Sequence, residues 1–354
     1  MEKYFIKIDV TLAEALKALV KVGSKCLIVV DNQKKLLGSL SDGDVRRAIL
    51  NKKKLNFKIS SIYNKKPIII LEKNFNNKLA ENIFLKNLID LIPVVDVNKN
   101  IIKVIIPLDV FGKTNSIKKK QLKSEVIIMA GGLGKRLEPF TQILPKPLMP
   151  INNKPIIKHI IDKFREHGLN KYTISVNYKS KILKAFFEEQ NNDYKIKYID
   201  EIKPLGTVGC LSKLKAKKNS DIFLTNCDII IDCDYYDLMN FHKKNKNLLT
   251  IVASTKTYSI PYGDCKLNSS GKLEKFEEKP EINLLANTGF YILNEKILKL
   301  IPKNQKYDVN ELIEKMISKK LNIGVFPVSE DSWIDIGNWD EYKKALNKFK
   351  TNEF

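Results

Sequence analysis

The order of apolar and polar positions in the first 50 residues predicts two helices and two strands. Apolar residues at helical spacing follow a capping box formed by Thr11 and Glu14; they are Leu12, Ala15, Leu16 and Leu19. The apolar run 26–30 predicts a buried strand, and a second strand that begins at residue 35 ends in the polar turn 41–44. A second helix is expected over 45–50.

The same order returns 65 residues further along, so the first third of the chain is an internal repeat. Ala80 corresponds to Ala15, the apolar run 91–95 to the first strand, and Asp109 to Asp44. Neither copy is long enough to bury a full core alone, so the two copies should pack face to face.

Beyond residue 125, apolar strands alternate with helical faces. One helix face stops at Gly168 and consists of Ile156, Ile157, Ile160, Ile161 and Phe164. Strands are expected at 126–130, 172–176, 196–199, 222–224 and 249–252. This alternation predicts an α/β domain with a mainly parallel, Rossmann-like sheet and helices on both faces. A nucleotide site should then lie at the carboxyl ends of the strands.

Length and composition narrow the class of protein. A chain of 354 residues suits two or three domains, and 44% hydrophobic with 29% charged residues is typical of a globular protein. No apolar run reaches the roughly 18–20 residues of a membrane span and no secretory leader is recognisable, so no membrane partner is expected. Five cysteines without a C-x-x-C pair argue against a disulfide framework or a zinc site and favour a cytoplasmic location.

The net charge of +22 does not by itself indicate nucleic-acid binding. Only four of the 62 basic residues are arginine, which is the residue that reads bases and clamps phosphates; they are Arg46, Arg47, Arg136 and Arg165. We interpret the lysines as a solvated surface and expect no nucleic-acid partner. Residues 1–120 hold 24 basic and 11 acidic residues, an excess that favours an anionic ligand there.

The turn in the first repeat carries a recognisable motif, Gly38-Ser39-Leu40-Ser41-Asp42-Gly43-Asp44. It resembles the strand-to-helix turn of cystathionine-β-synthase-type (CBS) domains, which implies a tandem α+β module with copies at 1–57 and 58–117. In that family the hydroxyl and turn amides hold phosphate and the aspartate accepts from ribose hydroxyls, roles that fall on Ser41 and Asp44.

The second copy departs from this motif. Lys103 replaces the glycine and Ile106 the hydroxyl, which leaves only Asp109. We therefore expect one regulatory nucleotide per chain, at the first copy, and a homo-oligomer. The alternative is a module that only dimerises.

A basic linker at 118–124 precedes a strand that runs into a glycine-rich turn at 131–137. Glycines and cations at a strand end let a backbone approach a polyphosphate. Two standard motifs are excluded. A Walker A loop would need glycine at Met129 and a hydroxyl at Arg136, and a dinucleotide fingerprint would need glycine or alanine at Leu137.

The turn belongs to a longer pattern, Gly131-Gly132-x-Gly134-x-Arg136-Leu137-x-Pro139-x-Thr141-x-x-x-Pro145-Lys146-Pro147-Leu148-x-Pro150. This pattern resembles that of sugar-1-phosphate nucleotidyltransferases, which implies a GT-A-type domain over 125–354. Later segments agree in order; they are Leu205-Gly206-Thr207-x-Gly209, Asn226-Cys227-Asp228, Tyr262-Gly263, Glu278-Lys279-Pro280, Asn287-Thr288-Gly289 and Trp333-Ile334-Asp335-Ile336-Gly337.

The resemblance implies that a sugar-1-phosphate attacks the α-phosphorus of a nucleoside triphosphate and expels pyrophosphate. The attacking phosphate is already largely dianionic near neutral pH, so no general base is required, and His159, His167 and His242 can all lie on the surface. The implied catalytic residues are Arg136 and Lys146, which neutralise the triphosphate.

The resemblance assigns binding roles to three sets of residues. The nucleotide-binding set is Ala130, Gly131, Gly132, Gly134, Lys135, Arg136, Leu205, Gly206 and Thr207. The sugar-phosphate set is Tyr262, Gly263, Glu278, Lys279, Asn287, Thr288 and Gly289. Asp228 and Asp335 are the implied Mg²⁺ ligands, carboxylates at strand ends that suit a hard cation.

Some of these residues also have a simpler interpretation. Asp335 could instead cap the next helix, and Lys146 and Lys279 could be solvated lysines. Cys227 is interpreted as a small buried side chain and Asp308 as a helix start.

The order of the domains bears on the base of the nucleotide donor and on the sugar of the acceptor. A CBS pair ahead of this domain most resembles bacterial guanylyltransferases that activate glucosamine-1-phosphate for legionaminic acid assembly. This favours GTP, and Glu201 is a carboxylate that could accept from guanine. The alternatives are thymidylyl, uridylyl or cytidylyl transfer to another hexose-1-phosphate, or a non-catalytic nucleotide-sensing subunit.

Overall fold

The computed structural model describes residues 1–87, 89–111, 121–190, 192–214 and 218–350. It divides into two compact units. The first contains 1–118, 254–286 and 327–331, and the second contains 119–253, 287–326 and 332–354. Positions 118–120 of the expected linker lie outside the described residues. Within the described ranges, we find no helix with the length and apolar composition needed to cross a membrane.

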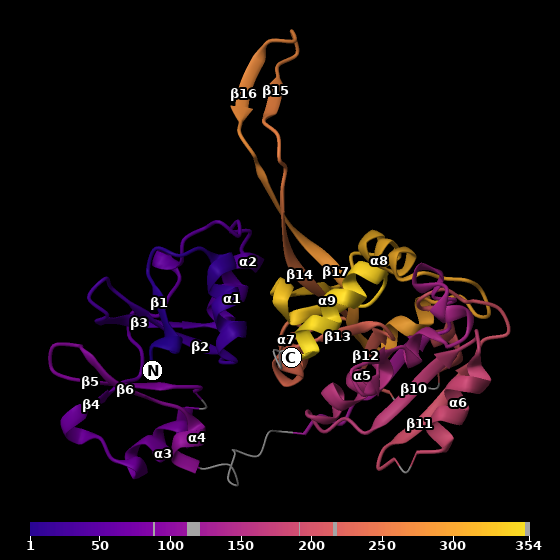
Figure 1. The fold of residues 1–354 in the computed structure, drawn as a ribbon, viewed down its shortest axis with the longest axis horizontal. Coiled ribbons are helices and arrows are strands. Elements are labelled where there is room, and N and C mark those ends of the chain that lie inside the picture. Colours follow the sequence, from indigo (N-terminus) through magenta and orange to yellow (C-terminus); the bar gives the residue numbers. More distant parts are fainter. Residues whose placement is uncertain (88, 112–120, 191, 215–217, 351–354) are drawn as a thin grey trace. The chain divides into compact units, whose positions relative to one another are not determined.

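The first unit contains the repeat (Figure 1). The first copy comprises β1 (Phe5–Lys7), α1 (Leu12–Val22), β2 (Cys26–Val30), β3 (Leu36–Ser41) and α2 (Asp42–Leu50). The second copy comprises β4 (Ile70–Leu71), α3 (Asn77–Asn87), β5 (Ile92–Val95), β6 (Ile101–Ile105) and α4 (Pro107–Phe111). Each copy forms a three-stranded sheet whose first two strands are parallel and whose last two are antiparallel. The repeat predicted from the sequence is therefore present in the structure.

The two copies share a hydrophobic core. Ile28, Val30 and Leu36 of the first copy cluster with Val95 and Val104 of the second. The copies thus pack against each other, as the sequence pattern predicts, because each sheet buries one apolar face on its duplicate.

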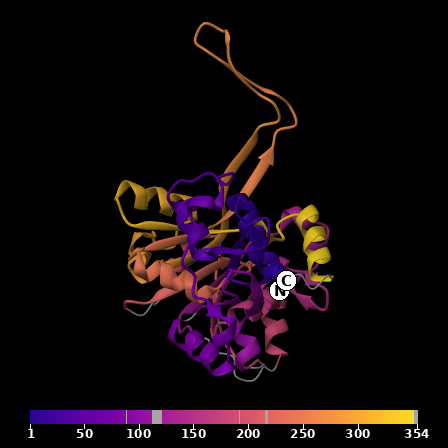
Figure 2. The same cartoon turned by 90° about the vertical axis from the view of Figure 1, so that its left-hand side faces the viewer.

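A two-stranded ribbon of β15 (Asp264–Leu267) and β16 (Leu273–Glu277) also belongs to the first unit. Among the described residues, these two strands pair with each other and with no third strand. Figure 2 shows the same ribbon from a second side.

A seven-stranded sheet in the order β11-β10-β7-β12-β17-β14-β18 lies mostly in the second unit, and parts of β14, β17 and β18 fall within the residues of the first. The bounds are β7 (Glu125–Ala130), β10 (Lys171–Val176), β11 (Lys195–Asp200), β12 (Asp221–Asn226), β14 (Leu249–Ser259), β17 (Glu281–Asn294) and β18 (Ile323–Val328). The first four strands in the order are parallel, and β17 runs antiparallel to β12. Two short strands, β8 (Pro150–Ile151) and β9 (Lys154–Pro155), form a separate pair.

Helices cover both faces of this sheet. Alternate residues of β12 point to opposite faces, so neighbouring residues of this strand contact different helices. Ile222 and Leu224 join a core with α8 (Val309–Ser318). Phe223, between them, contacts Phe164 of α5 (Ile156–Arg165) and Tyr235 of α7 (Tyr235–Lys244). The remaining helices are α6 (Ser180–Glu188) and α9 (Trp339–Lys350). The predicted α/β fold, with a mostly parallel sheet between helical layers, is confirmed.

Candidate functional site

The glycine-rich turn leaves the carboxyl end of β7 and turns sharply at Gly134. This residue has φ +70°, and a Cβ there would lie 2.9 Å from Thr141 Cγ2. The Thr141 hydroxyl donates to the Gly134 carbonyl at 3.0 Å. A side chain would therefore be strained and would collide with the residue that fixes the turn. The turn leads directly into a short helix at Lys135–Leu137, which carries Arg136.

A cavity of about 510 Å³ opens beside this turn. Its walls come from the carboxyl ends of β7, β11 and β12, the edge at which the sequence places a nucleotide site. The lining residues are Met129, Gly131, Gly132, Leu133, Gly134, Lys135, Arg136, Lys146, Glu201, Pro204, Gly206, Thr207, Asn226, Cys227, Asp228, Asp308 and Gly337. Most of the predicted nucleotide-binding residues are among them. Ala130 and Leu205 are instead buried next to the two loops.

Lys146 reaches this cavity from a turn that two prolines stiffen. It begins a short helix at Lys146–Leu148, between Pro145 and Pro147. Its ammonium forms an ion pair with Asp228, and both side chains are nearly buried, at 11% and 12% exposure. Lys146 is thus held inside the cavity by a charge and is not a solvated surface lysine.

Two carboxylates, Asp228 and Asp335, converge although they are far apart in the sequence. Strands β13 (Ile229–Ile231) and β19 (Trp333–Asp335) pair antiparallel with Ile229 opposite Asp335, and the Ile336 amide donates to the Asp228 carbonyl at 3.0 Å. Burial raises the pKa of Asp335, and the negative charge of Asp228 raises it further. The two carboxylates therefore repel each other electrostatically, an arrangement that a divalent cation relieves.

Arg136 approaches the same pair where Gly337 leaves room for it. A Cβ at Gly337 would lie 2.8 Å from Asp335 Oδ1 and 3.1 Å from Arg136 Nη2. The structure thus brings together the two predicted catalytic cations and the two predicted metal ligands.

No cluster of three or more His, Cys, Asp or Glu side chains suited to a metal occurs in the described ranges. Two carboxylates still fit Mg²⁺, which usually takes one or two protein carboxylates and fills its shell with water and substrate phosphates.

Glu201 lines the cavity, but its carboxylate already accepts two hydrogen bonds. The Ser175 hydroxyl donates to one oxygen and the Leu205 amide donates to the other at 2.8 Å. The side chain is 9% exposed. Its main action in the structure is to fix the loop that leads to Gly206.

Asp308 has a second role that local sequence pattern did not indicate. It caps α8 through a capping box with Glu311, as expected of a helix start. It also lines the cavity and accepts from the Thr207 amide at 2.9 Å. Because about 100 residues separate the partners, only the folded chain reveals this contact.

The predicted sugar-phosphate residues fall into two groups. Gly289, at φ +81°, packs so closely on Asn226 that a Cβ would lie 2.5 Å from Asn226 Nδ2, and Asn226 lines the cavity. The Thr288 hydroxyl donates to the Val252 carbonyl at 2.8 Å, and the Asn287 amide nitrogen donates to the Tyr291 hydroxyl at 2.8 Å. Gly289 thus supports the wall of the cavity through Asn226, whereas the partners of Thr288 and Asn287 lie outside the lining.

The other four, Tyr262, Gly263, Glu278 and Lys279, belong to the first unit. Gly263 lies against Glu278, since a Cβ there would be 3.0 Å from Glu278 Oε2. Their role in binding a sugar phosphate stays a prediction.

The expectation that all three histidines lie on the surface is wrong for two of them. His167 and His242 are 8% and 1% exposed, because their rings pack under Tyr235 and beside Thr250 respectively. None of the three lines the cavity.

In the first unit, Ser41 and Asp44 form a capping box at the start of α2. The Ser41 hydroxyl donates to Asp44 Oδ2 at 2.6 Å, and the Asp44 amide donates to the Ser41 oxygen at 3.2 Å. In the second copy only Asp109 remains, and it accepts from the Ile106 amide at 2.9 Å. The predicted CBS ligand residues are thus adjacent and also cap their helix.

The chain is thus an α/β protein with a glycine-rich turn, two cations and two carboxylates near the carboxyl ends of its parallel strands. Comparison with known protein families identifies the family to which the chain belongs. Residues 125–352 match the family described as nucleotidyl transferase, and residues 1–51 match the CBS domain. The chain belongs to the nucleotidyl transferase family.

Curated relatives of differing specificity resemble the chain. It is 32% identical over 220 residues to mannose-1-phosphate guanyltransferase 2 of Candida glabrata, covering 60% of each chain. It is 28% identical over 250 residues to a UTP–glucose-1-phosphate uridylyltransferase of Synechocystis, covering 65% of this chain and 64% of that one. The alignments therefore span less than two thirds of these relatives.

Among solved structures, HddC from Yersinia pseudotuberculosis matches with a TM-score of 0.50 and 24% identity. The match covers 64% of this chain and all of that one, and it shows a shared fold.

Proposed function

We propose that the protein is a sugar-1-phosphate nucleotidyltransferase, which transfers a nucleoside monophosphate from a triphosphate to a sugar-1-phosphate and releases pyrophosphate. The observation that carries this proposal is the group formed by Arg136, Lys146, Asp228 and Asp335 beside a glycine-rich turn, the first three of which line the cavity.

These residues suit a reaction that needs charge neutralisation and no general base. The sugar phosphate attacks the α-phosphorus, the bond to the β-phosphate oxygen breaks, and pyrophosphate leaves. Lys146 is held by its ion pair before substrate arrives, and Arg136 projects from the turn beside it, so both can stabilise the charge that grows on the triphosphate in the transition state. The amides of the glycine-rich turn can approach the phosphates because no side chain intervenes.

We assign Mg²⁺ to Asp228 and Asp335. When bound, Mg²⁺ would supply further neutralisation of the phosphate oxygens. In the structure the Lys146 ammonium is paired with Asp228, and a triphosphate would offer Lys146 another anion, which would free the Asp228 carboxylate to hold Mg²⁺.

For the donor and acceptor we propose GTP and glucosamine-1-phosphate. Relatives that carry the name mannose-1-phosphate guanyltransferase support the guanine base, as does the structure of HddC with GMP-PN. The uridylyltransferase relative favours the alternative, a different base. The sugar, and a role in legionaminic acid assembly in bacteria, rest on the domain order alone. We also place the enzyme in the cytoplasm, where its triphosphate donor is made.

A pyrophosphate-release assay tests these assignments. The purified chain is incubated with Mg²⁺, each of four nucleoside triphosphates and a panel of sugar-1-phosphates. We expect the highest kcat/KM with GTP and glucosamine-1-phosphate. A higher value with UTP or dTTP would reject the base, and equal use of mannose-1-phosphate would reject the sugar. Release with no pair would favour the non-catalytic nucleotide-sensing subunit.

A further inference from the structure

A second cavity, of about 880 Å³, lies at the opposite edge of the same sheet. The catalytic candidate sits at the carboxyl ends of the parallel strands, whereas this cavity is lined by Glu125, Lys171, Lys195 and Asp221, the first residues of β7, β10, β11 and β12. Its volume lies within the range of small-molecule sites.

The cavity is strongly basic. Five lysines line it, namely Lys123, Lys171, Lys195, Lys197 and Lys243, against the two carboxylates Glu125 and Asp221. Of these five lysines, Lys243 alone forms an ion pair within the described part of the chain. Its ammonium nitrogen lies 3.9 Å from a carboxylate oxygen of Asp221.

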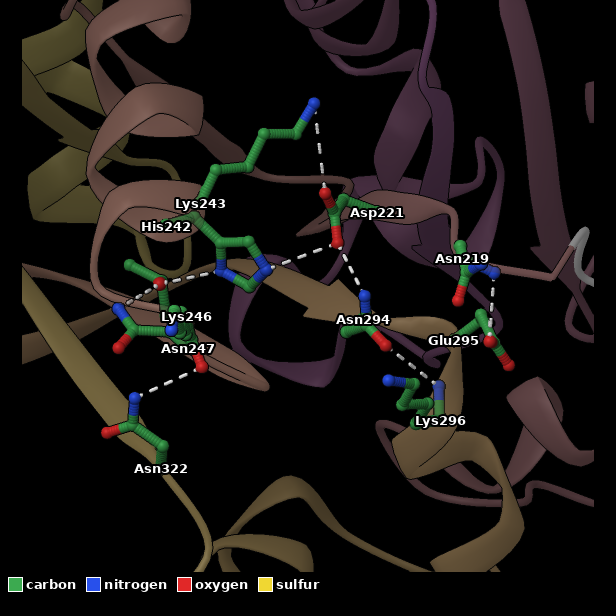
Figure 3. A network of polar contacts seen from close by, with 11 residues as sticks. Asn219, Asp221, His242, Lys243, Lys246, Asn247, Asn294, Glu295, Lys296 and Asn322 are labelled. Carbon is green, nitrogen blue, oxygen red and sulfur yellow. Dashed lines mark hydrogen bonds and ion pairs between the residues drawn. The ribbon is translucent and has the colours of Figure 1, made fainter.

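The two carboxylates are already engaged by the protein. Asp221 lies between His242 Nε2 at 3.3 Å and the Asn294 amide at 2.8 Å, with Lys243 beyond (Figure 3). Glu125 accepts from the Thr173 hydroxyl at 2.5 Å. Even with both carboxylates charged, the cavity has five lysines against two carboxylates, so an excess of positive charge remains.

Those lysines face one another by register. Lys171 is the direct partner of Lys195 on the neighbouring parallel strand, and Lys197 follows on the same side of β11. Like charges directly opposite one another in a sheet are destabilising, and an anion between them would remove the repulsion.

The rest of the lining adds hydrogen-bonding groups for an organic phosphate, since Asn219 and Asn240 are exposed and offer amides. Leu122, Tyr172, Ile222 and Met239 are nearly buried and form the floor of the cavity. Lysine ammonium groups bind phosphate as point charges on flexible stems.

We propose that this cavity is a second ligand site, for a phosphorylated small molecule with at least two negative charges. The site lies in the second unit, shares no lining residue with the catalytic candidate, and does not depend on the proposed reaction.

Lysine footprinting of the full-length chain tests the proposal, with inorganic pyrophosphate as the probe. The chain is acetylated for short times with and without pyrophosphate, sodium chloride holds the ionic strength constant, and peptides are quantified by mass spectrometry. We expect the acetylation rates of Lys171, Lys195 and Lys197 to fall saturably, by about tenfold at ten times the apparent Kd. Lys319 and Lys320, exposed lysines of the same unit, should keep their rates.

A charge-reversal variant localises the effect. In Lys171→Glu/Lys195→Glu the protection of Lys197 should be lost, whereas the matched variant Lys319→Glu/Lys320→Glu should retain it. Unchanged rates at all three cavity lysines in the wild-type chain, with pyrophosphate and with guanosine diphosphate, would overturn the proposal. An equal decrease at every exposed lysine would also overturn it, since this would reflect screening and not a site.

Discussion

At the scale of single residues, each predicted catalytic cation lies near one of the predicted metal-binding carboxylates. Lys146 is paired with Asp228, whereas Arg136 approaches Asp335 across Gly337. Lys146 is nearly buried, and its ion pair with Asp228 lowers the cost of burying both charges. Arg136 is exposed, so it is open to an incoming triphosphate.

Arg136→Ala should lower kcat by about 10²–10³-fold, the usual effect of removing one group that stabilises transition-state charge. Pyrophosphate release with the best substrate pair measures it. Arg165→Ala is the matched control, because Arg165 pairs with exposed Asp193 outside the cavity. A kcat for Arg136→Ala within about threefold of wild type would contradict the role of Arg136 in catalysis.

Asp228→Asn and Asp335→Asn should each raise the Mg²⁺ concentration needed for half-maximal activity, since each removes a negative ligand. Asp193→Asn should leave that concentration unchanged. Activity that persists in excess EDTA would show that the two carboxylates act without a metal.

At the scale of elements, turns and caps hold the site. Gly134 and Gly132 lie in one turn but differ in surroundings. Gly134 has φ +70° and Thr141 at 2.9 Å from a built Cβ, whereas a Cβ at Gly132 meets nothing within 4 Å. The turn thus depends on one glycine for its shape.

Gly134→Ala should destabilise the chain by about 1–3 kcal/mol, the cost of a strained backbone position plus the contact with Thr141. Gly132→Ala should leave stability nearly unchanged. The midpoints of thermal unfolding compare the two variants, and equal midpoints would contradict the strain argument.

Asp221 joins three elements, β12, α7 and β17, through His242, Lys243 and Asn294. Burial raises its pKa, but these three partners outweigh burial and hold the pKa below its ordinary value of 3.8. A carboxylate with a lowered pKa stabilises the fold above that ordinary value, and the contribution is lost as the pH falls through the lowered pKa.

Asp221→Asn should therefore be less stable than wild type near neutral pH, and the difference should narrow below about pH 4. Urea unfolding at several pH values measures the difference. A difference that stays constant down to pH 2 would mean that the charge of Asp221 does not contribute.

At the scale of the whole molecule, the local sequence pattern predicts those features whose residues are neighbours both in the sequence and in space. The Thr11–Glu14 capping box, the strand before Gly131 and the repeat could all be predicted from the sequence, since they depend on short-range periodicity. The contact between Thr207 and Asp308 and the burial of His242 could not, because tertiary packing decides them.

The repeat leads to a prediction about ligand number. Ser41 and Asp44 lie together at the start of α2, and the second copy keeps only Asp109. Isothermal titration calorimetry of the full chain with adenine and guanine nucleotides should lose one site per chain in Asp44→Ala and none in Asp109→Ala. Equal stoichiometry in the two variants would leave the module as a dimerisation element.

The wide spacing of the cavity residues also has a consequence for synthesis. Arg136 and Lys146 leave the ribosome roughly 200 residues before Asp335, which is about 10–40 s at ordinary elongation rates. Until β19 has been added, Asp228 lacks its partner carboxylate, and only one of the two proposed Mg²⁺ ligands is present. The nascent chain therefore lacks a complete metal site until residue 335 has been added, so we expect no transfer of a nucleotide before then.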